Sequence, residues 1–153
     1  MEKIESFKVD HTKLDPGMYI SRIDGDITTY DMRVKKPNTV PLLTNREMHS
    51  FEHMFATMIR NSGISENVIY FGPMGCQTGF YLLVRNAVHE KVIDETKKSL
   101  NAILDYEGEI FGKSRIECGN YISLDLESAK RVALEYKAIL VEIGEYSAAY
   151  RTV

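Results

Sequence analysis

Residues 68–84, VIYFGPMGCQTGFYLLV, decide the fold that we predict for this chain. Two apolar runs, VIYF at 68–71 and FYLLV at 80–84, are short and rich in β-branched and aromatic residues, as is typical of buried strands. The segment between them, GPMGCQTG, holds three glycines and a proline, which is the composition of a loop. We therefore predict two strands joined by a Gly-rich loop.

The sequence before this region predicts a hairpin and a helix. Residues 18–23 (MYISRI) and 27–34 (ITTYDMRV) are strand-like and flank Asp24-Gly25, which is a strong turn signal. A helix is expected from Arg46 to about Asn61, because a capping residue precedes it and a glycine follows it.

The sequence after this region predicts two further helices. An apolar stripe indicates a helix over 89–106, a short segment at 116–122 is interpreted as a strand, and a last helix is expected over 126–143. The order β-β-α-β-β-α-β-α favours the α+β class, with a mostly antiparallel sheet and helices packed on one face. We expect a single domain that spans 1–153.

The composition is that of a globular protein. The chain has 153 residues, of which 44% are hydrophobic and 27% charged, and this length allows one sizeable core. The 19 basic and 22 acidic residues give a net charge of −3, which argues against a nucleic-acid partner. The N-terminus has no apolar signal-peptide segment, and no apolar run approaches the roughly 20 residues of a membrane helix. We expect a cytoplasmic protein with no membrane partner.

The strongest chemical signal is the segment HSFEH at residues 49–53. His49 and His53 are four residues apart, so on a helix their side chains are neighbours and can bind one metal ion. Glu52 lies beside both, and a carboxylate near a metal can act as a general base; this residue order occurs in zinc hydrolases. The alternative is a solvated polar stripe on an amphipathic helix, and the local motif alone leaves both interpretations open.

Other residues could complete such a site. Two histidines need a third ligand, for which Cys118, Cys76, His11, His89 and several carboxylates are candidates. Each cysteine could also be a small buried apolar residue, and the two could form one disulfide bond. In a cytosolic protein, however, a pair of cysteines is more often metal-binding or catalytic. The glycines around Cys76 suggest a tight loop whose backbone amides face a ligand.

These residues together resemble the S-ribosylhomocysteine lyase family, the autoinducer-2 synthases. The matching segments occur in the family's order, with similar spacing, and cover most of the chain. They are SFKVDH at 6–11, YDMR at 30–33, KPN at 36–38, HSFEHMF at 49–55, PMGCQTGFY at 73–81 and CG at 118–119.

The resemblance implies a homodimer with two identical active sites at the subunit interface. It implies a divalent metal ion, typically Fe²⁺ with Zn²⁺ or Co²⁺ able to substitute, held by His49, His53 and Cys118. Cys76 and Glu52 match the acid–base pair of the family.

The resemblance also implies a substrate pocket and a reaction. Ser6, His11 and Arg33 match pocket residues, together with Phe7 and Asp31. The expected reaction moves a carbonyl along the ribose chain by proton transfers and then eliminates homocysteine from S-ribosylhomocysteine. The other product is 4,5-dihydroxy-2,3-pentanedione, the precursor of autoinducer-2, and no redox cofactor is needed.

Some positions depart from the family pattern. Tyr70 stands where an Asp is often found and Gly72 where Ser is common, so the pocket wall at 70–72 is expected to differ. Ser50-Phe51 replaces the common Thr-Leu, Lys35 replaces a non-catalytic Cys and Thr29 replaces a Lys of some members. None of these changes removes an expected metal ligand or the acid–base pair.

Two other hypotheses compete with the lyase. An inverted-motif zinc peptidase would use Glu52 to activate water, but it gives no role to Cys76 or Cys118 and normally takes a Glu as third ligand. A non-catalytic, metal-stabilised binding module would need no acid–base pair at all.

Overall fold

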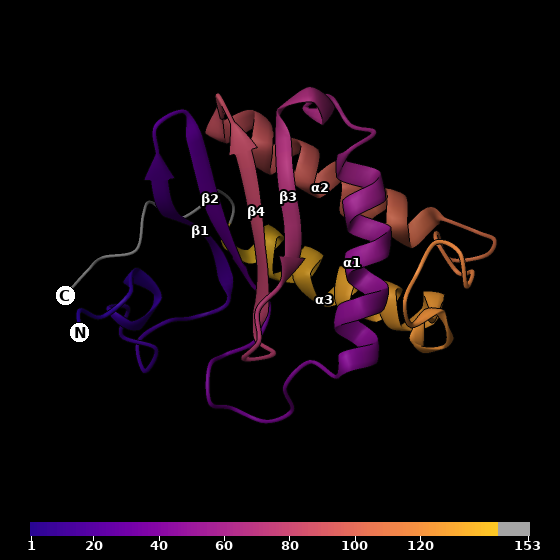
Figure 1. Cartoon of the computed structure of the whole chain (residues 1–153), viewed down its shortest axis with the longest axis horizontal. Coiled ribbons are helices and arrows are strands. Elements are labelled where there is room, and N and C mark those ends of the chain that lie inside the picture. Colours follow the sequence, from indigo (N-terminus) through magenta and orange to yellow (C-terminus); the bar gives the residue numbers. More distant parts are fainter. Residues whose placement is uncertain (144–153) are drawn as a thin grey trace.

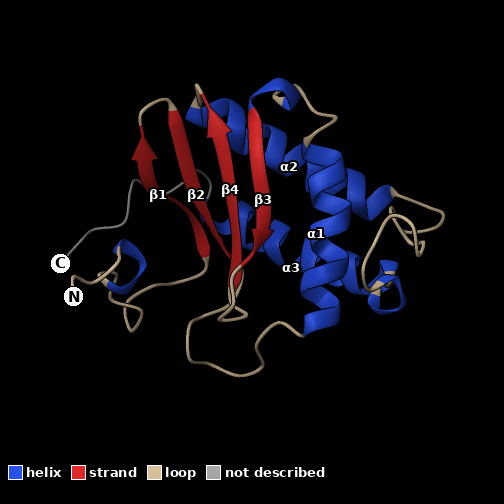
Figure 2. Cartoon of the chain, in the orientation of Figure 1, coloured by secondary structure: helices blue, strands red, loops and turns tan. Residues whose placement is uncertain are grey.

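The structure, a computed structural model, describes residues 1–143, so the last ten residues of the predicted 1–153 span lie outside the described residues. It consists of a four-stranded antiparallel sheet and three α-helices (Figures 1 and 2), which confirms the α+β prediction. The elements are β1 Gly17–Asp24, β2 Ile27–Arg33, α1 Asn45–Ile59, β3 Val68–Pro73, β4 Gly79–Arg85, α2 His89–Asp105 and α3 Leu126–Ile143.

The strand order places the Gly-rich loop beside the end of β2. The order is β1-β2-β4-β3, so the β3–β4 hairpin pairs with the β1–β2 hairpin through β2 and β4. Arg33, the last residue of β2, is opposite Gly79, the first residue of β4. A Cβ atom at Gly79 would lie 2.4 Å from the Met32 carbonyl oxygen, so only glycine permits this close approach.

One face of the sheet packs against the helices. Phe51 and Phe55 of α1 contact Phe71 of β3 and Phe80 of β4, with ring centroids 4.6–6.0 Å apart. All four rings are nearly or completely buried, and burial of one such side chain stabilises a fold by about 1.5–3 kcal/mol. The apolar stripe of α1, which includes Phe51 and Phe55, therefore fixes the helix against β3 and β4.

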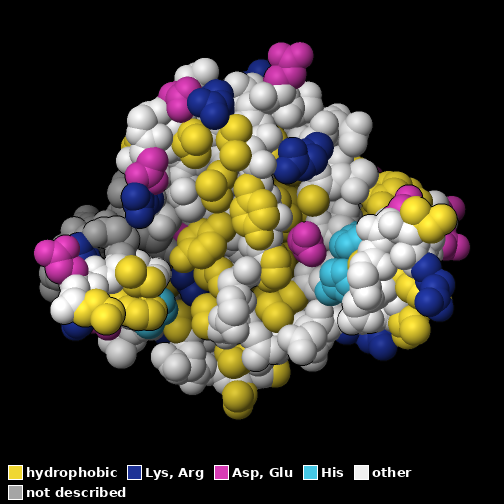
Figure 3. Space-filling view, in the orientation of Figure 1, with side chains coloured by type: hydrophobic (Ala, Val, Ile, Leu, Met, Phe, Trp, Pro, Cys, Tyr) yellow, Lys and Arg dark blue, Asp and Glu magenta, His cyan; other side chains and the backbone are white. Residues whose placement is uncertain are grey.

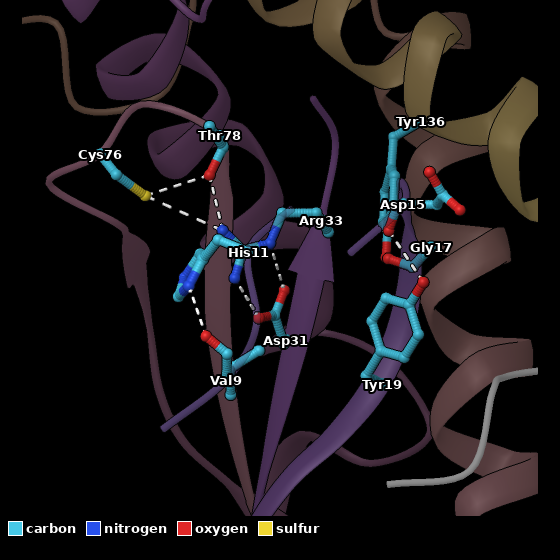
Figure 4. Close-up of polar contacts among 10 residues, drawn as sticks. All are labelled: Val9, His11, Asp15, Gly17, Tyr19, Asp31, Arg33, Cys76, Thr78 and Tyr136. Atoms are coloured by element: carbon cyan, nitrogen blue, oxygen red, sulfur yellow. Dashed lines mark hydrogen bonds and ion pairs between the residues drawn. The ribbon is translucent and has the colours of Figure 1, made fainter. Parts of the chain in front are cut away.

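The opposite face of the sheet is not covered by these helices. Figure 3 looks onto this face and shows apolar side chains gathered over the strands. Ile69 and Tyr70 on β3 are 38% and 52% exposed. At one end of this face, the buried Asp31 and Arg33 lie beside the N-terminal segment that carries His11 (Figure 4).

The predicted strand at 116–122 is wrong. Residues 106–125 form an irregular segment whose only regular element is a 3-10 turn, Tyr121–Ser123. Ile116 and Ile122 are 97% and 71% exposed, so their apolar pattern does not mark a buried strand. Arg60, just after α1, donates to the carbonyl oxygens of Val68 and Ile69 at 3.4 and 3.2 Å, so these two backbone acceptors of the edge strand β3 already have partners.

The helices within residues 1–143 differ from membrane-spanning helices. None of them combines the length and the apolar character that crossing a bilayer requires.

Candidate metal centre and acid–base site

Three of the predicted ligands come together beside α1. His49 and His53 project from the helix, Cys118 comes from the segment after α2, and their ligand atoms all lie within 4.8 Å of one another. The Cys118 Sγ is 3.3 Å from the His49 Nε2. Tetrahedral coordination with ordinary metal–nitrogen and metal–sulfur bonds separates such atoms by about 3.6 Å. The donor set and its spacing therefore fit one divalent ion.

Hydrogen bonds hold the His49 ring in the form that a ligand needs. The Nδ1 atom of His49 is 2.5 Å from the Ser123 Oγ, and Ser123 donates its hydroxyl hydrogen to the Asn120 carbonyl at 3.1 Å. A serine has only one hydroxyl hydrogen, so His49 must donate its Nδ1–H to Ser123. The Nε2 lone pair is then directed toward Cys118, as metal binding requires.

The second histidine is oriented by backbone. The Nδ1–H of His53 donates to the Phe111 carbonyl at 2.9 Å. The next residue, Gly112, has a φ of 72°, and a Cβ atom there would lie 2.8 Å from the His53 Nδ1. A glycine is thus required for the loop to approach the ring. The sequence did not identify Ser123, Phe111 or Gly112 as site residues. Only Gly112 stood out, because a glycine can mark a backbone position with a positive φ.

Burial changes the proton affinity of two groups at this site. It lowers the pKa of His49, with a further lowering from the nearby His53, so that His49 stays neutral and able to bind a metal. It raises the pKa of Glu52, against a smaller opposing effect of His53. A carboxyl group with a raised pKa is suited to exchanging protons near neutral pH.

A second cluster surrounds Cys76 in the β3–β4 loop (Figure 4). The Cys76 side chain is exposed, and its Sγ lies 3.0 Å from the Thr78 Oγ1 and 3.8 Å from the Arg33 Nη1. Arg33 is almost fully buried, and its Nη1 also donates to the Thr78 Oγ1 at 2.6 Å. The positive charge of Arg33, which the sequence predicted as a pocket residue, therefore lies beside the thiol, as a reactive cysteine requires.

Asp31 sets the orientation of Arg33. Both of its oxygens accept from the guanidinium, the Oδ1 from the Nε at 3.1 Å and the Oδ2 from the Nη2. Burial raises the pKa of Asp31 to about 6, against the charge and hydrogen bonds of Arg33, so the pair is ionised at neutral pH. Asp31 has no exposed surface, so it can shape a pocket only by positioning Arg33.

The other predicted pocket residues lie in the N-terminal segment. His11 is half-buried near Arg33, and its Nδ1 is 2.9 Å from the Val9 carbonyl oxygen (Figure 4). Ser6 and Phe7 belong to a 3-10 turn, Glu5–Phe7, and both are exposed. Phe7 retains 71% of its exposure, which leaves an aromatic ring open to a ligand or a partner chain.

The two cysteines are free thiols in separate clusters. The contacts described above tie Cys118 to α1 and to the segment after α2, and they tie Cys76 to β2 and β4. None of these contacts joins the two clusters. In Figure 1, the β3–β4 loop and the segment after α2 lie at different edges of the molecule.

The fold and the site define an α+β protein with a candidate His₂Cys metal centre and a separate thiol held beside a buried arginine. The family model described as S-Ribosylhomocysteinase (LuxS) matches residues 4–145, and the chain belongs to this family. The resemblance seen in the sequence is thereby confirmed.

Close relatives agree with this assignment. A protein of Finegoldia magna named S-ribosylhomocysteine lyase is 44% identical over 98% of this chain and 99% of its own length. Proteins with the same name are 42% identical in Borreliella afzelii, over 98% of this chain and 99% of the relative, and 41% identical in Clostridium acetobutylicum, over 95% and 96%.

Proposed function

We propose that this protein is an S-ribosylhomocysteine lyase, which cleaves its substrate to homocysteine and 4,5-dihydroxy-2,3-pentanedione. The observation that carries the proposal is the presence of two chemical centres, the His₂Cys cluster and the Cys76–Arg33 cluster. The family membership and the names of the relatives support the substrate. A zinc peptidase would leave Cys76 and Arg33 without a role, and a binding module would need neither Cys76 nor Glu52.

The metal centre uses His49, His53 and Cys118 as ligands. A bound divalent ion would supply Lewis acidity, which polarises a carbonyl group and acidifies the neighbouring C–H bond. Two nitrogens and one sulfur suit several first-row ions, and we propose Fe²⁺ as the physiological one, with Zn²⁺ or Co²⁺ able to substitute.

Cys76 is the base for the carbonyl shifts. In the open-chain sugar, removing the C2 proton and returning a proton to C1 moves the carbonyl from C1 to C2. Repeating the transfer from C3 to C2 moves it to C3. The positive charge of Arg33 at 3.8 Å stabilises the thiolate that takes each proton, and the exposure of Cys76 allows substrate to reach it.

Glu52 is the base for the elimination. With the carbonyl at C3, the C4 proton is acidic and the sulfur on C5 is in the β position. Glu52 takes the C4 proton, the C5–S bond breaks and homocysteine leaves as a thiolate that is then protonated. The raised pKa of Glu52, caused by its burial, suits a carboxyl group that accepts and returns a proton.

The complete active site forms between two copies of the chain. The uncovered sheet face exposes Ile69 and Tyr70, a surface suited to a second subunit. In such a homodimer, the Cys76 cluster of one subunit faces the metal ligands of its partner. The two free thiols suit a reducing compartment, so we place the reaction in the cytoplasm.

The activity is tested directly by thiol release. Metal-loaded protein is mixed with pure S-ribosylhomocysteine, and free homocysteine is measured with a thiol reagent. We expect one homocysteine to be released for each S-ribosylhomocysteine consumed, with many turnovers per subunit. No thiol release by metal-loaded, folded protein would refute the proposed function.

The shared active site is tested by mixing inactive variants. Cys76→Ala and Cys118→Ala are each expected to be inactive. A dimer with one subunit of each has one site in which both cysteines are intact, if the site draws Cys76 and Cys118 from different subunits. An equal, fully exchanged mixture should then recover about a quarter of the unaltered activity, since half of the dimers are mixed. No recovery, with exchange confirmed by mass, would place each site within one subunit.

A further inference from the structure

Thr78 connects Arg33 to Cys76. Its side chain is 2% exposed, and its Oγ1 has two partners, the Arg33 Nη1 at 2.6 Å and the Cys76 Sγ at 3.0 Å (Figure 4). The Thr78 hydroxyl group therefore lies between the guanidinium and the thiol and contacts both. Thr78 lies in the segment 73–81 that matches the family, but it was not predicted as a site residue.

The direction of the two hydrogen bonds follows from the chemistry of the partners. A guanidinium group can only donate, so the Thr78 oxygen accepts from Arg33. The single hydroxyl hydrogen is then free to be donated to the Cys76 sulfur. A charged acceptor strengthens such a bond, so this geometry favours the thiolate over the thiol.

We propose that Thr78 is a positioning residue that holds Cys76 and stabilises its thiolate, through an O–H···S bond that Arg33 polarises. Only the use of that thiolate in proton transfer rests on the proposed function. The hydrogen bond itself does not depend on any substrate.

The backbone around Thr78 is fixed in a way that a positioning role requires. Its carbonyl oxygen accepts from the backbone N–H groups of Val34 and Lys35, both at 2.9 Å. The close approach of Gly79 to the Met32 carbonyl brings the start of β4 against β2. Thr78 therefore cannot move away from Arg33 without breaking the junction between these strands.

Other charged or titratable groups also face Cys76 or its partners. Arg33 and, through it, Asp31 lie on β2, and His11 lies on the N-terminal segment. Tyr81 lies on β4, where burial is the main cause of a raised pKa and Cys76 contributes slightly. All four remain in a Thr78 variant, so a change on removing the hydroxyl is attributable to Thr78.

The test compares variants that differ in the hydroxyl group. Thr78→Val keeps the side-chain shape and removes the hydroxyl, Thr78→Ala removes it with less bulk, and Thr78→Ser retains it. Thr39→Val, at an exposed threonine of a neighbouring loop, is the matched control. The rate of iodoacetamide alkylation at Cys76 is measured against pH by mass spectrometry of the Cys76 peptide, without substrate.

We expect the midpoint of the alkylation profile to rise by about one pH unit in Thr78→Val and Thr78→Ala, equivalent to about tenfold slower alkylation below the midpoint. Thr78→Ser and Thr39→Val should keep the original midpoint. An unchanged midpoint in the folded Val or Ala variant would overturn the proposal, and so would an equal shift in the Ser variant. A failure of the unaltered protein to release homocysteine would refute the lyase function and leave this result standing.

Discussion

Gly112→Ala is expected to weaken metal binding although residue 112 donates no ligand atom. The new methyl group would lie 2.8 Å from the His53 Nδ1 and 3.0 Å from its Cε1, closer than any carbon can stay. The loop or the ring must therefore move. Either movement breaks the hydrogen bond from His53 to the Phe111 carbonyl, which orients the ring for binding.

The magnitude has two parts. The backbone at residue 112 has a φ of 72°, where a non-glycine residue costs about 1–2 kcal/mol of folding free energy. Loss of an orienting partner of a ligating histidine typically lowers metal affinity by about 10–100-fold. Gly112→Ala should show both effects.

Gly25→Ala is the matched control. Gly25 has a φ of 61° and open space around its Cβ position, so the variant carries the same kind of backbone strain without touching a ligand. Metal affinity is measured by competition with a chelator, and the free energy of unfolding by denaturant titration. We expect both variants to lose stability, Gly112→Ala by more because of its clash with His53, and we expect weaker metal binding only in Gly112→Ala. Unchanged metal affinity in folded Gly112→Ala would refute the assigned role of this loop.

Three further predictions follow from other contacts. Cys118→Ala should lose the metal, whereas Cys76→Ala should keep it and lose turnover; equal metal content in the two purified proteins would contradict this division. Asp125 caps the start of α3, and hydrogen bonds from Ser128 lower the pKa of its carboxyl group in the folded protein. The stability that this cap contributes is therefore present above the pKa that Asp125 has in the unfolded chain, and it is lost as the pH falls through the lower pKa of the folded protein. Asp125→Ala should cost about 1 kcal/mol at pH 7 and much less near pH 2, as checked by urea unfolding at both pH values. Gly72→Ser should destabilise the protein less in a Tyr70→Ala background, because the Tyr70 hydroxyl lies 2.0 Å from the Cβ position of residue 72; a double-mutant cycle without coupling would exclude this clash.

The regular elements could be predicted because local patterns decide them. The helix expected over 46–61 occurs at Asn45–Ile59, and the last helix has the predicted bounds, Leu126–Ile143. The apolar stripes of these helices match one buried face, and capping residues mark their starts. The adjacency of His49 and His53 was also predictable, because helical spacing alone makes the two side chains neighbours, and their ring centroids lie 4.7 Å apart.

The irregular segment after α2 could not be predicted in this way. Its shape depends on contacts with α1, from which it is distant in sequence; Ser123 is 74 residues from the histidine that it orients. The apolar residues in it suggested a strand, but the segment folds around the imidazoles instead. Its alignment with the site is a tertiary effect that its local apolar pattern does not encode.

The two departures from the family pattern at residues 70 and 72 are best understood as one change. They are two positions apart on β3, and the Tyr70 hydroxyl occupies the space in which a side chain of residue 72 would begin. The aromatic ring therefore requires the glycine, and a serine at position 72 would force the ring outward. Considered separately, the two substitutions look like losses of polar groups from β3. Considered together, they replace two small polar side chains with one large ring that carries its own hydroxyl, so this part of β3 keeps a polar group in a new position.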